Sequence, residues 1–304
     1  MTERDDRTRY APVAMFAYSR PEHTQRTLDA LAANNLACDT DLIVFQDGPR
    51  TEIDEAACDA TAEVVADTKG FRSVRLIRRE SNIGLADNII SGVGEVVSQN
   101  GKVIVVEDDL VTAPHFLSFM NAALNRYENS PQVWHISGWT YPIETDGLED
   151  AFFYRVMNCW GWATWADRWS AFDRSAELRK PFSAAQKKAF NLDGFHDFHE
   201  QIRDNLAERR RTWAIFWYAT IFRRGGLCLN PARSLVENIG HDGTGENCGI
   251  GIEQATLCDQ GSALTLPDEI RENELALARI KQHLRISFHR RALRRIIRYF
   301  RNAL

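Results

Sequence analysis

Short apolar runs and longer amphipathic stretches alternate over residues 12–140. Apolar runs bounded by turn signals are typical of strands buried on both faces of a parallel sheet. The expected strands are Pro12–Tyr18, Asp41–Gln46, Val74–Ile77, Lys102–Leu110 and Val133–Ser137. The helices expected between them are Glu22–Asn34, Thr51–Thr68, Leu85–Gln99 and Pro114–Tyr127. This alternation predicts an α/β fold with a doubly wound, mostly parallel sheet.

The second half of the chain is rich in aromatic residues. Asn158–Trp169 holds four tryptophans, and Trp162, Trp165 and Trp169 follow a helical i, i+3, i+7 spacing. This spacing predicts a helix whose tryptophans pack into the core. Thr212–Arg224 is expected to be a buried helix, because it is apolar and ends at two glycines. Residues 227–248 return to a strand and a glycine-rich loop, which favours a mobile lid.

Three adjacent carboxylates follow the β-branched run Val103–Val106. They are Glu107, Asp108 and Asp109, at the carboxyl end of an expected buried strand. An open α/β sheet binds its ligands at that end. A divalent cation can hold neighbouring carboxylates together, and their hard oxygens suit Mg²⁺ or Mn²⁺ completed by substrate phosphates. The sequence thus suggests a metal–diphosphate site, and the alternative is an acidic turn without a ligand.

The common nucleotide-binding loops are missing. No GxGxxG follows the first strand, and no GxxxxGK[ST] occurs. A nucleotide would therefore be held by strand-end side chains. Asp47 ends the second strand and could accept a hydrogen bond from a base N–H, although turn chemistry explains it equally. Arg20 follows the first strand and could meet a base or a phosphate, or it could be a solvated surface charge.

Five blocks carry a resemblance to a known family. They are YSRP (18–21), QDGP (46–49), RESNIGLADNI (79–89), VVEDDL (105–110) and GWATW (161–165). In this order they resemble glycosyltransferases of the GT-A fold, in particular bacterial relatives of the N-acetylglucosaminyltransferase I family and family 2 transferases. The resemblance covers residues 12–250, and the carboxylate triplet matches the DXD motif of these enzymes.

The resemblance implies roles for individual residues. It matches Asp109 to the metal ligand, Asp108 to the residue facing the donor sugar, and Glu107 to the residue near the ribose. It also implies a donor site in which Arg20 and Asp47 contact the uracil of a UDP-sugar and the diphosphate and ribose side is lined by Asn82, Gly84 and Leu85. Apart from the resemblance, Trp160 precedes the tryptophan stripe and is the better placed for a wall of the site. Because the faces of tryptophan rings suit the C–H faces of sugars, we expect Trp160 or Trp162 to contact sugar.

The catalytic base departs from the family pattern. An inverting transferase needs a carboxylate that deprotonates the acceptor hydroxyl. The matching stretch, around Ala214, offers no carboxylate. We expect the base in the glycine-rich loop instead, at Asp242 first and Glu246 second.

The C-terminal stretch differs in charge from the rest of the chain. The net charge is −5, and Arg279–Leu304 contains nine Lys and Arg and no acid, so residues 1–278 carry −14. Apolar residues recur at helical spacing among these arginines, which predicts a basic amphipathic helix lying on an anionic membrane. The alternative is a helix docked on the acidic body. The acidic body argues against nucleic acid as a partner.

The remaining composition fits a cytoplasmic enzyme. Hydrophobic residues make up 44% of the 304, which is enough for a large core. The first residues lack the apolar segment of a secretory signal. The six cysteines are scattered, as expected of reduced thiols rather than a disulfide framework or a zinc site.

The sequence therefore predicts a peripherally membrane-associated glycosyltransferase. We expect a GT-A domain over 1–265, with a donor half at about 10–140 and an acceptor and lid half at about 141–265, followed by the basic helix at 266–304. The expected reaction moves a hexosyl or N-acetylhexosaminyl group, with inversion, from a nucleotide-sugar to a glycan or lipid-linked acceptor in surface polysaccharide assembly. Two alternatives remain, a sugar-nucleotide nucleotidyltransferase and a non-catalytic nucleotide-sugar-binding protein of the same fold.

Overall fold

The computed structural model describes residues 10–243, 257–258 and 264–285. Its strands are β1 (Val13–Ala17), β2 (Asp41–Gln46), β3 (Ser73–Arg78), β4 (Lys102–Glu107), β5 (Leu110–Thr112), β6 (Val133–Ser137), β7 (Ala151–Tyr154), β8 (Trp162–Trp165), β9 (Leu227–Pro231) and β10 (Val236–Asn238). Its α-helices are α1 (Pro21–Ala32), α2 (Glu52–Asp67), α3 (Leu85–Asn100), α4 (Phe116–Arg126), α5 (Ala166–Trp169), α6 (Arg174–Arg179), α7 (Ala184–Phe190), α8 (His199–Leu206) and α9 (Ala214–Arg223). Two 3₁₀ turns are η2 (Ala37–Asp39) and η3 (Leu192–Gly194).

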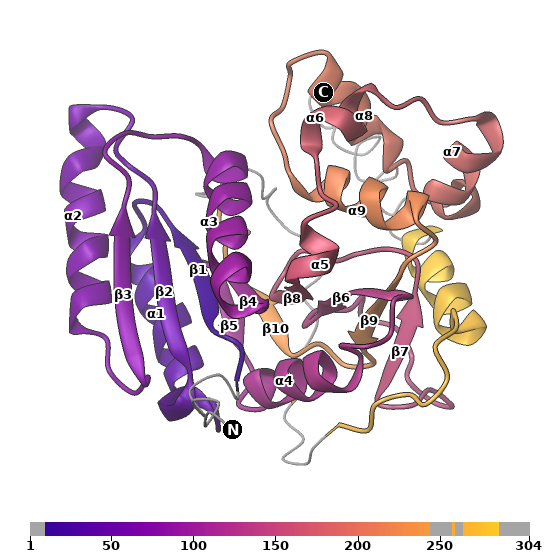
Figure 1. Cartoon of the computed structure of the whole chain (residues 1–304), viewed down its shortest axis with the longest axis horizontal. Helices are drawn as coiled ribbons and strands as arrows, with labels where there is room; N and C mark the ends of the chain where they lie inside the picture. The colour runs from indigo at the N-terminus through magenta and orange to yellow at the C-terminus, as the bar shows by residue number, and fades with distance from the viewer. Residues whose placement is uncertain (1–9, 244–256, 259–263, 286–304) are drawn as a thin grey trace, which may run out of the picture.

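A mixed sheet forms the centre of the described chain, with the strand order β3-β2-β1-β4-β8-β6-β9-β7 (Figure 1). The pairs β3-β2, β2-β1, β1-β4 and β6-β9 are parallel, and β8 and β7 run antiparallel to their neighbours. The predicted class, α/β with a mostly parallel sheet, is confirmed. The chain steps from β1 to β2 and β3, then returns to the other side of β1 for β4. The strand order thus reverses between β1 and β4, where such sheets bind ligands.

Alternating side chains of the central strands fill two cores, one on each face of the sheet. In β1, Val13 and Met15 belong to one core, and Ala14 and Phe16 belong to the other. All are buried. A strand buried on both faces has no polar side, which is why the expected strands are continuous apolar runs rather than alternating ones.

Local sequence signals set the helix ends in the first part of the chain, about residues 10–140. Pro21 opens α1, where its missing N–H costs no helical hydrogen bond. Thr51 and Asp54 form a capping box at the start of α2. Gly84 and Gly101 bound α3 with φ angles of +80° and +76°, which favour glycine. The expected and observed boundaries of these helices differ by one or two residues.

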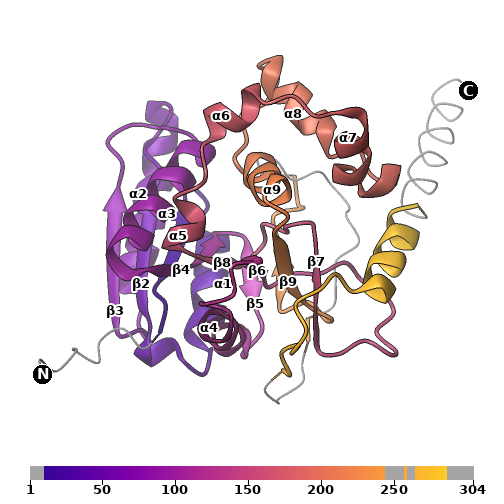
Figure 2. The same ribbon diagram turned by 45° about the vertical axis from the view of Figure 1, so that its right-hand side comes forward.

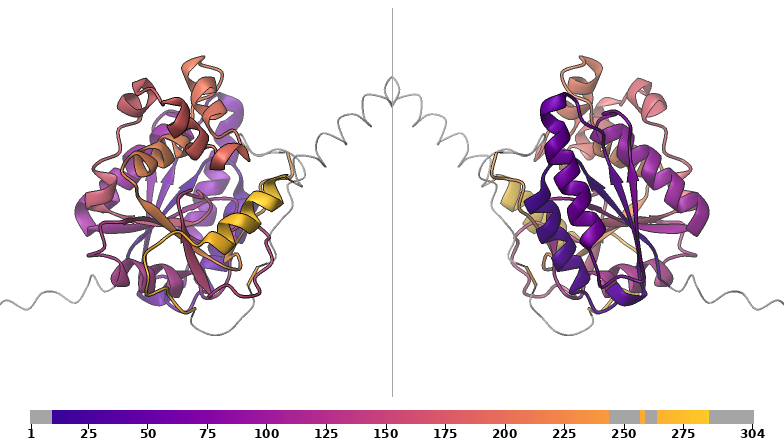
Figure 3. Two further views of the ribbon diagram at one scale, coloured as in Figure 1. Left: turned by 90° about the vertical axis from the view of Figure 1, so that its right-hand side faces the viewer. Right: turned by 90° about the vertical axis from the view of Figure 1, so that its left-hand side faces the viewer.

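A helical lobe covers the other half of the sheet. Helices α6, α7 and α8 stand apart from the strands, and α9 lies between this lobe and the sheet (Figures 1 and 2). Seen from the two sides, α1 and α2 lie on the β3 side of the molecule, while α6–α9 and the helix at 274–285 lie on the β7 side (Figure 3). Helix α9 is buried as expected.

Two local predictions were wrong. Trp162–Trp165 is strand β8, not part of a helix. Its first and last tryptophans therefore enter opposite cores, while Trp169 in α5 joins the core of Trp162. The expected core role of the three tryptophans is right. The strand expected over Lys102–Leu110 breaks at Asp108 and Asp109, which form the turn between β4 and β5, while Glu107 ends β4. These three residues are called the acidic turn below.

The described start of the expected basic helix packs on the body. Residues 274–285 are helical and bury Ala276, Leu277, Ile280 and Leu284 (Figure 2). The arginine-rich stretch, 286–304, lies outside the described residues. Within the described ranges, no helix has the length and apolarity to span a bilayer.

Candidate functional site

Three strand ends bring the predicted donor residues together. Ala17 pairs with Gln46 across β1 and β2, and Phe16 pairs with Glu107 across β1 and β4. The residues that follow these positions therefore leave the sheet side by side. This places the turn after β1, the turn after β2 and the acidic turn after β4 around the point where the strand order reverses.

Arg20 is bound to the acidic turn. Its Nη2 atom forms ion pairs with both Asp108 and Asp109, with a distance of 2.9 Å to Oδ2 of Asp109. The main-chain oxygen of Asp108 accepts a hydrogen bond of 2.8 Å from Thr27 in α1. The start of α1, from Arg20 to Thr27, and the acidic turn are therefore joined through both side chain and backbone.

The acidic turn carries more negative charge than Arg20 neutralises. Burial raises the pKa of Glu107 to about 8, and the charges of Asp109 and Asp108 add to this effect. Burial also raises the pKa of Asp108 to about 6 against the attraction of Arg20. Burial disfavours the guanidinium of Arg20, but the two aspartates outweigh it and raise its pKa above the ordinary value. A further cation near these carboxylates would favour their ionised forms.

Asp47 organises the loop before α3. Its carboxylate accepts hydrogen bonds from the backbone N–H groups of Gly48, Ile83 and Gly84, at 3.0, 2.9 and 2.9 Å. Asn82 adds a bond of 2.9 Å to the carbonyl of Gly48. The predicted residues Asp47, Asn82 and Gly84 are thus one connected unit, and the next residue, Leu85, packs on the core at the start of α3.

A two-stranded ribbon delivers the second part of the site. Strand β10 pairs antiparallel with β5, so that Asn238 lies opposite Leu110. The N–H of Ile239 donates to the carbonyl of Asp109 at 2.8 Å. Gly240 follows directly against the carboxylate, where a Cβ atom would lie 2.2 Å from Oδ2 of Asp109. This contact requires glycine as long as the carboxylate keeps its place.

The loop after β10 places Asp242 near the first turn of α1. Oδ2 of Asp242 lies 3.1 Å from Nε2 of His23, and its side chain is 43% exposed. Asp242 is therefore close in space to the acidic turn. Glu246, the second expected base, lies outside the described residues.

Trp160 forms part of an aromatic wall beside this loop. Its ring packs edge to face on His241 and on Trp139, at 5.4 and 4.8 Å between centroids. Trp162 instead is fully buried, so of these two tryptophans only Trp160 has surface that could contact a sugar.

Two members of the site were not predicted from the sequence. His23 and Gly240 join it through contacts between segments far apart in the chain. His23 follows the YSRP block by two residues, and Gly240 is the first glycine of the glycine-rich loop. Each therefore lies beside a motif that the sequence had indicated.

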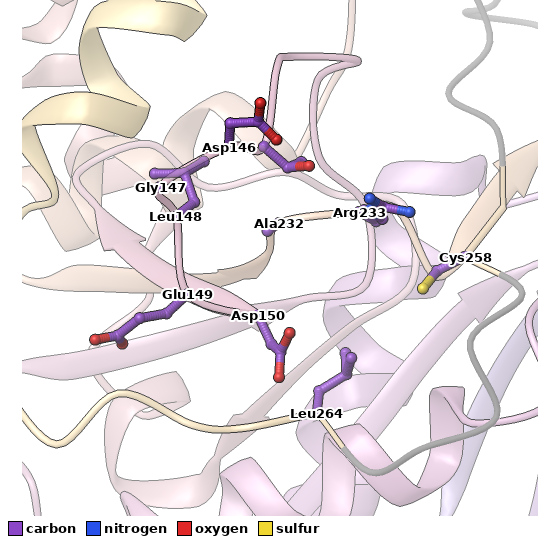
Figure 4. A pocket seen from close by; sticks show the side chains of 10 residues that line it. Asp146, Gly147, Leu148, Glu149, Asp150, Ala232, Arg233, Cys258 and Leu264 are labelled. Carbon is purple, nitrogen blue, oxygen red and sulfur yellow. The ribbon is translucent and has the colours of Figure 1, made fainter.

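A cavity lies away from the acidic turn. It has a volume of about 270 Å³ and is lined by the loop at 145–150, by Ala232 and Arg233, and by Cys258 and Leu264 (Figure 4). Ala232 follows β9, which is separated from β4 by β8 and β6. None of the residues expected in the donor site lines this cavity.

Metal ligands are few in the described part of the chain. In residues 10–243, 257–258 and 264–285, no three His, Cys, Asp or Glu side chains are grouped as a metal site. The carboxylates of the acidic turn are the oxygens available there. A metal at this turn would hence be held by one or two protein ligands and completed by a substrate, which is the usual arrangement for Mg²⁺ at phosphates.

Comparisons with known proteins find distant structural similarity. No protein-family model matches the chain, and no curated protein matches its sequence. Solved structures that match include TarS of S. aureus (TM-score 0.31, 13% identity, 38% of this chain and 20% of TarS). They also include the mannosyltransferase PcManGT from Pyrobaculum calidifontis with GDP-Man and Mn²⁺. This match has a TM-score of 0.39 and 13% identity and covers 71% of this chain and 70% of PcManGT. The galactosyltransferase LgtC with donor and acceptor sugar analogues matches with a TM-score of 0.37 and 12% identity. This match covers 69% of this chain and 70% of LgtC.

The second and third of these structures are named as glycosyltransferases. The chain spans a fifth of the length of TarS and 70% of the length of each of the other two. With TM-scores below 0.4, the likeness is too distant to assign roles to residues. The roles proposed below rest on the geometry of this chain and on its motifs.

Proposed function

We propose that the chain is a glycosyltransferase that moves a sugar from a nucleotide-sugar, with a UDP-sugar as the expected donor, to a glycan or lipid-linked acceptor. One observation carries the proposal. Arg20 meets Asp108 and Asp109 where the strand order reverses between β1 and β4. A guanidinium beside carboxylates at this position suits a ligand that combines phosphates with a cation.

The residues present fit a divalent cation bound together with a diphosphate. The acidic turn offers hard carboxylate oxygens, and the raised pKa values of Glu107 and Asp108 indicate that positive charge is in short supply there. In this proposal Asp109 is the metal ligand, Asp108 faces the donor sugar and Glu107 lies near the ribose. When bound, Mn²⁺ or Mg²⁺ would stabilise the charge that develops on the leaving nucleoside diphosphate.

The nucleoside end of the donor is assigned to the turns after β1 and β2. In this proposal Arg20 and Asp47 contact the uracil, and Asn82, Gly84 and Leu85 line the diphosphate and ribose side. The hydrogen bonds of Asp47 to the N–H groups of Ile83 and Gly84 support this role, because they fix the loop that would form the wall. The same geometry holds the N-terminus of α3, a favourable place for phosphate, beside the site.

Asp242 is the base that we propose for the acceptor hydroxyl, with inversion at the anomeric carbon. It follows the ribbon that packs on Asp109, and its contact with His23 fixes the orientation of the carboxylate. Helix α9 supplies no alternative, because Ile215, Phe216 and Trp217 are buried apolar side chains. Trp160 is proposed to contact the sugar through its partly exposed ring.

Release of nucleoside diphosphate from sugar nucleotides tests the function. Incubation with a panel of UDP- and GDP-sugars and Mn²⁺ should release UDP, slowly without acceptor and faster with a glycan acceptor. Asp109→Asn should reduce the release at least about 100-fold, because it removes charge stabilisation from the transition state. Asp29→Asn, on the exposed side of α1, is the control and should keep the rate.

Two outcomes would contradict the proposal. Nucleotide-sugar formation from a sugar phosphate and a nucleoside triphosphate would identify a nucleotidyltransferase. Tight donor binding without any turnover would identify a non-catalytic binding protein. An Asp242→Asn variant with normal turnover would leave the function intact and remove Asp242 as the base.

A further inference from the structure

Arg20 occupies the place where a cation would approach the acidic turn. One nitrogen, Nη2, forms ion pairs with both Asp108 and Asp109, and the side chain of Arg20 is only 21% exposed. The bond to Asp109 is made to Oδ2. A guanidinium in this position neutralises the turn without any metal.

The same oxygen of Asp109 is enclosed from a second side. Gly240 lies so close that a Cβ atom would come within 2.2 Å of Oδ2. Backbone of the loop after β10 and the guanidinium of Arg20 therefore share the surroundings of one carboxylate oxygen. A metal ion that binds Oδ2 needs the place that Nη2 holds.

The other terminal nitrogen of Arg20 has a different environment. Within the described residues, Nη1 is buried and has no hydrogen-bond partner. A buried donor without an acceptor destabilises the arrangement that holds it. A phosphate oxygen that reached Nη1 would remove this cost and would also attract the whole guanidinium, because arginine binds phosphate through two nitrogens.

We propose that Arg20 is an internal cation that competes with the divalent metal for Asp108 and Asp109, and that the nucleoside diphosphate releases the carboxylates by drawing the guanidinium to its phosphates. This inference rests on the proposed function, since it presumes a metal–diphosphate site. It moves Arg20 from the uracil to the phosphates and leaves the uracil contact to Asp47. It adds an order of binding: the metal binds weakly to the free protein and tightly together with the donor. The negative charge of the turn then stays neutralised while the site waits for its donor.

The proposal predicts a reciprocal coupling between the two ligands. If the diphosphate removes the competitor of the metal, UDP must raise the affinity for Mn²⁺ and Mn²⁺ must raise the affinity for UDP by the same factor. Coupling of this kind lies at about 5–150-fold in linked sites. Direct contact between metal and phosphate also contributes to this coupling. The contribution of Arg20 is therefore the difference in coupling between the wild type and the Arg20 variants.

Mn²⁺ binding without nucleotide tests the proposal directly. Free Mn²⁺ is followed by electron paramagnetic resonance with the wild type, Arg20→Met and Arg20→Lys. Methionine keeps an unbranched stem without the charge, and lysine keeps a charge that cannot bridge two carboxylates in the same way. Mn²⁺ affinity should rise at least about tenfold in Arg20→Met and less in Arg20→Lys, and the coupling to UDP should fall in the same order.

Arg26→Ala is the matched control. Arg26 lies on the exposed side of α1, so its removal changes the net charge equally without touching the acidic turn. It should leave the Mn²⁺ affinity within about twofold of the wild type. Thermal unfolding of each variant shows that the fold is kept, and Arg20→Lys serves where Arg20→Met does not fold.

The outcomes separate this inference from the proposed function. If the wild type binds UDP with Mn²⁺ but the Arg20 variants do not tighten Mn²⁺ binding, the competition is refuted and the function stands. If the wild type already binds Mn²⁺ alone as tightly as with UDP, the competition is refuted as well. If the wild type binds no UDP with or without Mn²⁺, the proposed function fails, whatever the metal does alone.

Discussion

At the scale of single residues, Asp47 has a structural role beside the ligand role that we propose for it. Its position at a strand end allowed either turn chemistry or contact with a base, and its carboxylate accepts three backbone N–H groups. The turn chemistry is therefore present whether or not a nucleotide binds.

Removing the Asp47 carboxylate should weaken the fold. Asp47→Ala removes the charged acceptor of the N–H groups of Ile83 and Gly84, and a hydrogen bond to a charged group contributes about 1.5–3 kcal/mol. The free energy of unfolding, measured in urea, should fall by about this amount. Asp67→Ala at the exposed end of α2 removes the same charge and should change it by less than about 0.5 kcal/mol. Equal stability of Asp47→Ala and wild type would refute the role of the loop bonds.

His135 is a buried residue whose protonation opposes the folded state. It lies in the core, stacks on Trp162 and accepts from the indole N–H of Trp217 at 3.2 Å through Nδ1. Burial lowers its pKa from 6.5 to about 3. The folded state therefore holds a neutral ring, whereas the unfolded state takes up a proton below about pH 6.5. Stability is fully present above this pH and is lost as the pH falls toward 3.

A glutamine at position 135 should reduce this acid sensitivity. Between about pH 6.5 and about pH 5, the wild type should lose about 1.4 kcal/mol per pH unit through this group. His135→Gln cannot take up the proton. Its free energy of unfolding, measured in urea, should therefore fall by about 2 kcal/mol less between these two pH values than that of the wild type. His115→Gln, near the surface, is the control. A variant that loses as much stability in acid as the wild type would exclude His135 as the cause.

At the scale of elements, contacts between distant segments complete the site. Strand β10 on β5 brings Gly240 and Asp242 to the acidic turn, and the order β2-β1-β4 brings Arg20 to the same place. The aspartates and Arg20 were each predicted at strand ends. Their direct contact depends on which strands are neighbours and on how the side chains turn, and these were not predicted.

The expected strands and helices of the donor half agree well with the structure because local patterns determine them. Long apolar runs, Pro21 and two bounding glycines leave little choice there. The tryptophans were harder, since a strand followed by a short helix also places Trp162, Trp165 and Trp169 in the core. Periodicity alone does not separate these cases over so few residues. The pairing of β5 with β10 leaves no local signal at all.

Gly240→Ala tests the contact between the ribbon and the acidic turn. The added Cβ would lie 2.2 Å from Oδ2 of Asp109, so the carboxylate must move from its place beside Arg20. UDP affinity in the presence of Mn²⁺ should fall at least about tenfold, while stability changes little. Gly94→Ala in α3 is the control, because its nearest atom would be 3.9 Å away. Unchanged UDP binding by Gly240→Ala would show that the carboxylate tolerates the displacement.

At the scale of the whole molecule, the C-terminal stretch has two parts. Residues 274–285 belong to the body, through buried Leu277 and Ile280 and through the ion pair of Lys281 with Asp193. The basic stretch beyond them, 286–304, remains our proposed membrane contact. Such contact would suit a lipid-linked acceptor and a peripheral position at the inner face of the cell membrane.

Two truncations separate these parts. A chain ending at residue 285 should unfold at the same temperature as the full chain. A chain ending at residue 273 loses a helix that buries several apolar side chains, each contributing about 1.5–3 kcal/mol, and should be strongly destabilised. Equal stability of the two truncations would show that the helix contributes nothing to the body.

The chain ending at 285 also tests the membrane contact. The full chain should pellet with liposomes that contain anionic lipid, since each arginine near such a surface contributes about 1 kcal/mol. Removal of 286–304 should abolish pelleting and leave nucleotide binding unchanged. Pelleting that persists without this stretch would place the membrane contact elsewhere.

The central claim is that the acidic turn after β4 binds a metal and a nucleoside diphosphate together. Calorimetric titration of UDP, with and without Mn²⁺, into the wild type and Asp109→Asn tests it most directly. The account predicts binding that needs Mn²⁺ and is lost in the variant. UDP binding that is the same without Mn²⁺, or that survives Asp109→Asn unchanged, would contradict it.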